Sequence, residues 1–300
     1  INGYKVIIGA GVEQAKYTNN TFQKTFIPTG TDTITALRYA SSLGFFKFNA
    51  FYQLSRSFLK DKLTLSAGFR LDGNNYSKEM SNPLRQFSPR ASVSIGLSDK
   101  FTLNMNAGRY FQQPSYTTLG YRDSTGVLVN KQNNITFIQA DHLVGGVEFR
   151  RTAESRFSLE GFIKWYSKYP FSVNDSVSLA SKGADYGVYG DEAVVSTSSG
   201  RAYGAEIYYR DVLFDRINTI LSYTFVRSEF GDNREKLIPS AWDNRHILNL
   251  TVSSAFGRNW NAGAKWRFVG GAPYTPYDYE RSSIIEAYDA SGQGYPDYRL

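Results

Sequence analysis

Apolar and polar residues alternate with a period of two along most of this chain. In residues 249–268, Leu250 and Val252 alternate with polar neighbours, and beyond a turn the apolar positions continue through Trp266 and Phe268. Alternation over this length predicts two antiparallel strands, each with one apolar and one polar face. The apolar face of such a hairpin either covers a protein core or faces lipid around a wet interior.

The same alternation recurs from one end of the sequence to the other, without helical periodicity. The predicted strands carry their apolar faces at residues 4–12, 46–54, 63–71, 91–97, 101–107, 143–149, 157–165, 203–209, 217–225, 250–252 and 260–268. One more strand is predicted to begin at residues 298–300. We therefore expect an all-β, antiparallel chain of about 11–12 strands.

The connections between these strands fall into two classes of length. Short turns are predicted at residues 60–61, 98–100, 153–154, 213–215 and 257–259. Long loops are predicted at residues 18–42, 77–86, 112–138, 170–200, 228–244 and 270–297. Short and long connections alternate strictly, which in an up-and-down barrel places all short turns at one end and all long loops at the other. The pattern predicts a transmembrane β-barrel.

The short turns also predict which residues face each other across a hairpin. Val93 should meet Met105 across the turn at residues 98–100, and Leu250 should meet Trp266. The other predicted pairs are Leu97–Phe101, Ile95–Leu103, Ala91–Ala107 and Val252–Ala264. A shift of one residue would place apolar side chains opposite polar ones, so these pairs define the register.

The polar face of the predicted strands carries many charged side chains. They are Lys5, Glu13, Lys47, Arg70, Asp72, Arg90, Glu148, Glu160, Lys164, Glu206, Arg210, Lys265 and Arg267. A soluble β-sandwich is also polar outside, but long structureless loops are unusual in a compact domain. Many apolar faces begin or end in an aromatic residue, as the interfacial girdles of membrane barrels do. We therefore predict that Trp260, Trp266 and Leu250 face lipid, whereas Lys265 and Arg267 face a wet lumen.

Composition agrees with a membrane barrel and argues against other classes. Aromatic residues make up 16% of the chain, yet the mean hydropathy is −0.39 and no apolar run is long enough for a transmembrane helix. Cysteine is absent, which removes disulfides and thiolate metal sites. The net charge of +7 comes from scattered basic residues without a basic arm or helix, so we expect no nucleic-acid partner.

Two stretches resemble parts of a known family of membrane barrels. Residues 87–116, FSPRASVSIGLSDKFTLNMNAGRYFQQPSY, begin a strand with Ser-Pro-Arg and end the next with Gly-Arg-Tyr-Phe. Residues 242–278 begin a strand with Asp-x-Arg-His and leave the hairpin through Gly-Ala-Pro-Tyr-Thr-Pro. Both stretches, together about a fifth of the chain, are similar to the barrels of TonB-dependent outer-membrane receptors.

The resemblance implies a location in the outer membrane of a Gram-negative bacterium. It also implies a barrel of 22 strands filled by an N-terminal plug, on which TonB pulls. We expect residues 1–300 to be a middle-to-late segment of such a barrel, without the plug and the terminal strands. A segment of this kind should not close on itself, because its edge strands would leave unpaired backbone groups in lipid.

The function implied by the resemblance is import of a scarce, bulky solute of the siderophore, glycan or peptide class, bound through long extracellular loops. The alternatives are a passive pore or a barrel scaffold subunit of a larger envelope assembly, and an outer-membrane hydrolase. Expected partners are outer-membrane lipid, the TonB complex through a plug outside this chain, and a surface lipoprotein or other envelope subunits. We expect no enzymatic activity, cofactor or metal, because His142 and His246 lack partners at motif spacing.

Ligand-binding residues are predicted where strands meet the long loops, which are rich in tyrosine. Phenol rings can stack on sugars or aromatic chelators while their hydroxyls form hydrogen bonds. The candidates are Arg109, Tyr110, Gln112, Gln113, Tyr116, Tyr186, Tyr274 and Tyr277. The alternative for each tyrosine is that it packs the loops against one another or marks the membrane interface.

Thiol labelling tests the predicted topology, in which the short turns face the periplasm. Asp191→Cys, in a long loop, should react with a membrane-impermeant thiol reagent on whole cells, because long loops face outside. Asp99→Cys, in a short turn, should stay unlabelled on the same cells. The reverse pattern would invert the topology.

Overall fold

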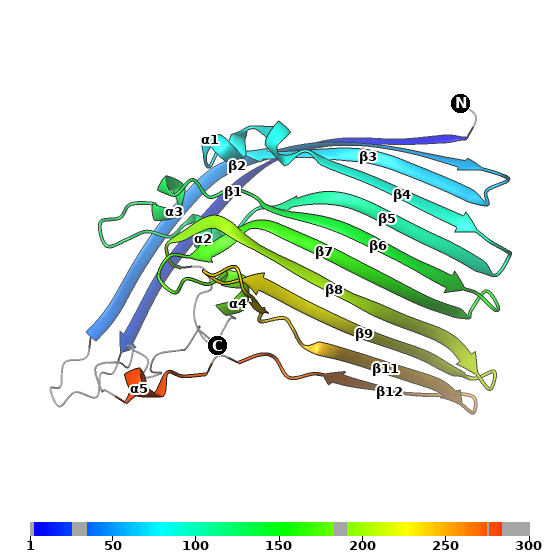
Figure 1. Ribbon diagram of the computed structural model, residues 1–300. Coiled ribbons are helices and arrows are strands. Elements are labelled where there is room, and N and C mark those ends of the chain that lie inside the picture. Colours follow the sequence, from blue (N-terminus) through cyan, green and yellow to red (C-terminus); the bar gives the residue numbers. More distant parts are fainter. Residues whose placement is uncertain (1–2, 26–34, 183–190, 275, 284–300) are drawn as a thin grey trace.

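The computed structural model describes residues 3–25, 35–182, 191–274 and 276–283, with the backbone alone described at 23–25 and 35–37. These residues form one antiparallel sheet in chain order, with a short strand, β10, paired to β9 (Figure 1). The strands are β1 (Tyr4–Thr25), β2 (Thr35–Phe58), β3 (Leu63–Asn74), β4 (Ser88–Gly96), β5 (Phe101–Gln112), β6 (Ile138–Phe149), β7 (Arg156–Ser172), β8 (Val194–Leu213), β9 (Ile217–Gly231), β10 (Leu237–Pro239), β11 (Arg245–Phe256) and β12 (Trp260–Val269). Single helical turns lie in the connections: α1 (Lys78–Ser81), η1 (Pro83–Gln86), α2 (Tyr116–Leu119), α3 (Val129–Gln132), α4 (Leu179–Lys182) and α5 (Tyr279–Ser282). None of the described helices is long and apolar enough to span a membrane.

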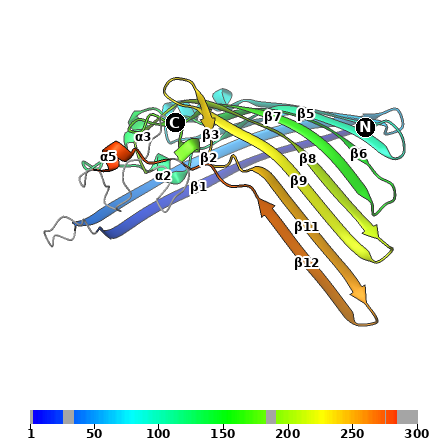
Figure 2. The same cartoon turned by 60° about the horizontal axis from the view of Figure 1, so that its bottom comes forward.

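The sheet curls into a trough, with the short turns at one end and the helical turns at the other (Figures 1 and 2). The short connections are residues 59–62, 97–100, 150–155, 214–216 and 257–259. The predicted antiparallel, up-and-down order is therefore confirmed. Among the described residues β1 and β12 form the two edges of the sheet, which is open, as expected. The strand predicted to begin at residues 298–300 lies outside the described residues.

Pairing across the hairpins follows the predicted register. Val93 lies opposite Met105, and Leu250 lies opposite Trp266. The pairs Ile95–Leu103, Ala91–Ala107 and Val252–Ala264 are confirmed as well. The turn between β4 and β5 closes as predicted, with the backbone N–H of Leu97 donating to the carbonyl of Phe101 at 2.9 Å.

The two faces of the sheet differ in character. On one, which we call the outer face, large apolar side chains are exposed: Ile8, Val12 and Trp260 have 73%, 79% and 78% of their surface accessible. Apolar surface on this scale is favourable against lipid rather than water. The opposite, inner face carries ion pairs such as Lys47–Glu13, at 2.6 Å. This division agrees with the prediction that the apolar face meets lipid and the charged face a wet interior.

The structure corrects the long loop predicted at residues 18–42. β1 and β2 stay paired through most of this stretch, as far as Thr25 opposite Thr35. The two strands are 22 and 24 residues long, about twice the ~10 residues that cross a bilayer. Beyond the bilayer neither face has to meet lipid, so pairing continues without the alternation that reveals a strand in the sequence.

Other predicted long loops are also partly strand. β7 continues to Ser172, and β9 continues to Gly231, where β10 folds back on it. The register of β7 against β8 shifts between Tyr166 and Phe171, so a β-bulge follows Trp165, an exposed aromatic residue of the outer face. The sequence does not predict the helical turns, because four residues are too few to show a period of 3.6.

The buried core lies at the end of the sheet that carries the long connections. We call this cluster the cap; its buried members are Ala15, Leu43, Phe45, Tyr76, Met80, Leu119, Ile135, Phe137, Leu179 and Val194. The connections following β3, β5 and β7 all contribute to it, so they pack on the β1–β2 hairpin and on one another. Inside the cap, Tyr76 Oη donates a hydrogen bond to the carbonyl of Leu119 at 2.8 Å.

A charged cluster links three parts of the connection between β7 and β8 to one another. Lys182 Nζ forms ion pairs with Asp175 and Glu192, and only 19% of the lysine side chain is exposed. Burial alone would lower the pKa of Lys182, but hydrogen bonds to the two carboxylates outweigh it, and the pKa is raised. The stabilisation is therefore complete below the ordinary lysine pKa and is lost as the pH rises through the raised value.

A pair of adjacent substitutions tests the assignment of the two faces. Leu221→Arg places a charge on the outer face of β9, whereas Ser222→Arg places the same charge on the inner face. We expect the first to lower the free energy of unfolding in lipid vesicles by about 2–4 kcal/mol if the site is near the bilayer midplane, and the second to have little effect. Equal losses for both variants would contradict the assignment.

A lysine substitution tests the charged cluster. Lys182→Met should raise amide hydrogen exchange in residues 171–182 and 191–195, because two half-buried carboxylates lose a charged partner at a cost of about 1.5–3 kcal/mol. Lys236→Met, at an exposed lysine in the connection after β9, serves as the control. Adding Asp175→Asn and Glu192→Gln to Lys182→Met should recover part of the protection. Unchanged exchange in the single variant would show that the cluster does not hold this connection.

Candidate functional site

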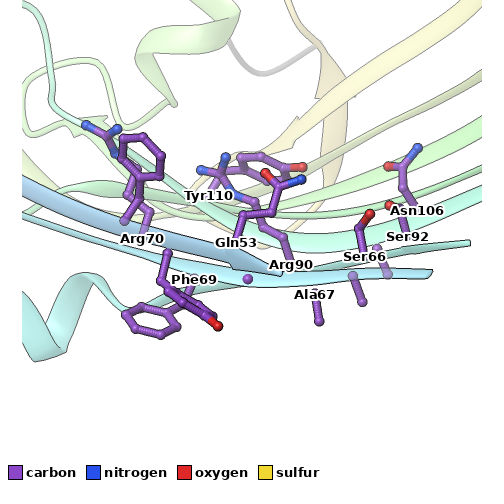
Figure 3. Close-up of a pocket in the computed structure, with 14 residues that line it drawn as sticks. Gln53, Ser66, Ala67, Phe69, Arg70, Arg90, Ser92, Asn106 and Tyr110 are labelled. Atoms are coloured by element: carbon purple, nitrogen blue, oxygen red, sulfur yellow. The ribbon is translucent and has the colours of Figure 1, made fainter. Parts of the chain in front are cut away.

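A hollow of about 400 Å³ lies on the inner face where β2, β3, β4 and β5 run side by side (Figure 3). It is located on a row of paired residues that crosses these strands, Gln53–Gly68–Arg90–Gly108. Gly68 contributes no side chain to the inner face, so space remains beside Arg90 on the β3 side. Gly68 is therefore one reason that the hollow exists.

Arg90 provides the charge of the hollow. Its guanidinium carbon lies 4.3 Å from the centroid of the Tyr110 ring, and the Tyr110 ring lies 4.4 Å from that of His142. A Cβ atom at Gly108 would lie 3.0 Å from the Arg90 side chain and 3.3 Å from the Tyr110 ring, so glycine permits this close packing. No carboxylate within the described ranges lies at ion-pair distance from Arg90.

Arg70 also points into the hollow, but its charge is already compensated (Figure 3). Its Nε donates to both carboxylate oxygens of Asp72, at 2.9 and 2.8 Å. The hollow thus presents one cation without a carboxylate partner, supported by an aromatic ring. A guanidinium in this setting binds carboxylate, phosphate or other oxyanions in a bidentate manner and stacks on flat rings.

Uncharged polar groups complete the lining. Gln53, Ser66, Ser92 and Asn106 point to the same side of the sheet as Arg90 (Figure 3). Ala67 and Phe69 point to the opposite side. The polar side chains offer hydrogen-bond donors and acceptors around the cation. The arrangement can hold a bulky anion by charge, stacking and hydrogen bonds.

Of the predicted ligand-binding residues, the structure places Tyr110 in this hollow. Arg109, the preceding residue, belongs to the other face and donates from Nε to Asp141 Oδ1 at 2.7 Å. Gln112 is exposed at the end of β5, and the Gln113 side chain accepts a hydrogen bond from Asn74 at 3.2 Å. Adjacent positions in a strand point to opposite faces, so the predicted stretch is divided between two surfaces.

The other predicted ligand-binding residues, all tyrosines, lie in different parts of the chain. Tyr116 packs on the cap, with its ring stacked on Tyr17 at 6.2 Å and its hydroxyl accepting a hydrogen bond from Lys47 at 3.0 Å. Tyr274 and Tyr277 are 87% and 45% exposed in the segment that follows β12. Tyr186 lies outside the described residues. The packing role weighed for these tyrosines holds for Tyr116, and a ligand-binding role for any of the predicted residues stays a prediction.

The sequence indicates the inner-face location of Arg90 but not its role in a hollow. The available signal is the pairing of Arg90 with Gly68 and Gly108, which becomes visible only once the register of three strands is assigned. Asp141 and His142 lie on opposite faces, so the Asp–His neighbours do not form an acid–base pair. His246 Nδ1 lies 2.9 Å from the Tyr223 hydroxyl, so the ring forms a hydrogen bond to a neighbouring strand.

Comparison with known proteins identifies the family. The family model described as TonB dependent receptor-like, beta-barrel, matches residues 3–299. A search of curated proteins gave no match. Among solved structures, the ferric-catecholate import receptor Fiu from Escherichia coli K12 is 12% identical, with a TM-score of 0.64, over 89% of this chain and 42% of that one.

Two further solved structures share this fold. The copper transporter OprC is 16% identical, with a TM-score of 0.59, over 89% of this chain and 41% of that one. FpvAI, in a complex with pyocin S2, is 15% identical, with a TM-score of 0.64, over 93% of this chain and 38% of that one. The chain therefore spans less than half the length of these proteins, and at such identities the likeness concerns the fold. By the family match, the chain belongs to the TonB-dependent receptor-like β-barrels, outer-membrane proteins of Gram-negative bacteria.

Proposed function

We propose that this chain is the barrel wall of a receptor that imports a scarce, bulky, anionic solute across the outer membrane, with a metal-chelating siderophore as the best-supported class. The observation that carries the proposal is Arg90, a cation without a carboxylate partner among the described residues, placed beside Tyr110 on the inner face of a barrel of this family. Iron chelators offer clustered oxyanions and often flat aromatic rings, which match a guanidinium and a phenol.

Transport would use the two ends of the sheet differently. Solute would first meet the long connections, which are packed into the cap, and would then pass the inner face that carries the hollow. TonB would supply the energy through a plug outside this chain, as in the family at large. Fiu is named as an import receptor for ferric catecholate and OprC as a transporter of copper, and both names are in keeping with metal-linked cargo.

The alternative is a passive pore or a scaffold subunit of an envelope assembly. An inner face lined by ion pairs would suit a pore as well, and dependence of import on TonB distinguishes the receptor from the pore. A hydrolase has no support in the described residues, because Asp141 and His142 lie on opposite faces and the family consists of transport receptors.

Uptake measurements separate these functions. Cells that carry or lack the gene would be given iron-loaded catecholate siderophores, iron-loaded hydroxamate siderophores and copper, each radiolabelled and limiting. Import of a siderophore that requires both the gene and TonB supports the proposal. Import that requires the gene but persists without TonB, or after the inner membrane is de-energised, indicates a pore, and no gene-dependent import of any probe contradicts a receptor for metal-linked cargo.

Arg90→Gln tests the hollow within the full-length receptor. We expect uptake of the transported siderophore at limiting concentration to fall about tenfold or more, because a charge-assisted hydrogen bond contributes about 1.5–3 kcal/mol. Arg267→Gln removes an arginine from the inner face of β12, outside the hollow, and should leave uptake close to wild type. Equal uptake in both variants, at equal receptor abundance, would show that the hollow does not take part in transport.

A further inference from the structure

The outer face carries a groove over β3, β4 and β5. One row of paired residues crosses β3, β4 and β5 as Ala67–Ala91–Ala107. The adjacent row of the outer face has larger residues on the same three strands: Leu65, Val93 and Met105. The three alanines therefore form the floor of a depression that larger side chains border on the same strands.

The depression has a volume of about 560 Å³, and its walls are apolar. Leu54, Leu65, Val93, Met105 and Leu143 stand around the three alanines. A hollow of this kind on a lipid-exposed surface matches a flexible hydrocarbon chain, which can follow it and recover contacts that a flat surface does not give. In an outer-membrane barrel the hydrocarbon that reaches this face is the acyl chain of a lipid.

One end of the groove carries a positive charge. Arg56 lines the groove near the short turn between β2 and β3, with its guanidinium 4.4 Å from the Tyr4 ring centroid and 4.7 Å from that of Phe58. Arg56 donates one hydrogen bond to the Tyr4 hydroxyl, and no carboxylate in the described part of the chain pairs with it. Two rings thus hold a guanidinium that still has N–H groups to donate.

The position of Arg56 determines the kind of lipid. Short turns of outer-membrane barrels lie on the periplasmic side, so Arg56 is placed at the headgroup level of the periplasmic leaflet. The lipids of that leaflet are glycerophospholipids, whose phosphate can accept two parallel hydrogen bonds from one guanidinium. The apolar groove therefore fits an acyl chain, and the charge of Arg56 fits the phosphate of the same lipid.

We propose that the groove over Ala67, Ala91 and Ala107 is a specific site for one glycerophospholipid of the periplasmic leaflet. One acyl chain lies along the three alanines, and the phosphate binds Arg56. The site depends on the family's location in the outer membrane and not on the identity of the transported solute, so it stands or falls independently of the proposed function.

Native mass spectrometry of the delipidated, full-length receptor tests this site. The probes are a palmitoyl-oleoyl phosphatidylethanolamine and a diacylglycerol with the same chains but no phosphate. Wild-type receptor should retain one phospholipid, and it should bind the diacylglycerol about tenfold more weakly, because the charge-assisted contact is missing. Arg56→Gln should bring the phospholipid down to the affinity of the diacylglycerol, and Arg56→Lys should lie between the two because it keeps the charge without the planar fork.

Groove-filling variants distinguish this site from general lipid adhesion. Ala91→Phe occupies the floor of the groove and should weaken binding of both probes about tenfold through overlap with the chain. Ala50→Phe, at an exposed outer-face alanine of β2 outside the groove, is the matched control and should bind as wild type. Heat-modifiable migration in gel electrophoresis would verify folding of each variant. Equal retention by Ala91→Phe and Ala50→Phe, or no preference for the phosphate-bearing probe in wild type, would overturn the proposal.

Discussion

A chain that crosses lipid as strands has to pair every backbone N–H and C=O group with a neighbouring strand, because the hydrocarbon offers no partner. This constraint produces the continuous ladder from β1 through β9 to β11 and β12. The ladder in turn divides side chains by parity into an outer and an inner set. Both surface features described above depend on that division, since a shift of one residue would exchange the two sets.

The elements that cross the membrane could be predicted from the sequence, because lipid imposes an alternation that the residues have to display. Val93 opposite Met105 and Leu250 opposite Trp266 follow directly from turn length and parity. Above the membrane the same reasoning fails. The upper part of the β1–β2 hairpin is a paired ribbon without apolar alternation, and four-residue helical turns such as α2 carry no period. In that region tertiary packing on the cap, rather than local pattern, determines the structure.

Candidate site residues were harder to predict for a related reason. The motif that contains Arg109 and Tyr110 was identifiable, but the two side chains lie on opposite faces. The guanidinium that packs on the Tyr110 ring comes from Arg90 of a different strand. The hollow on the inner face and the groove on the outer face occupy neighbouring rows of the same strands. On the inner face Gly68 leaves space beside Arg90, and Gly108 lets Arg90 pack against Tyr110. On the outer face the floor of the groove is formed by Ala67, Ala91 and Ala107. Small residues thus concentrate in β3, β4 and β5. This concentration becomes visible only after the residues of the three strands are aligned by their register.

The bulge in β7 has a consequence for how such a barrel can change over evolutionary time. Between Tyr166 and Phe171 the strand loses and regains register immediately beyond Trp165. Inside the bilayer, the insertion of a single residue would place charged side chains on the face that meets lipid. Selection should therefore remove such insertions there. Beyond Trp165 no lipid enforces parity, and an odd number of residues can be gained or lost without disturbing the part of the sheet inside the bilayer. Variation in length is thereby confined to the stretch that begins where the lipid ends, at the end of the sheet that carries the cap.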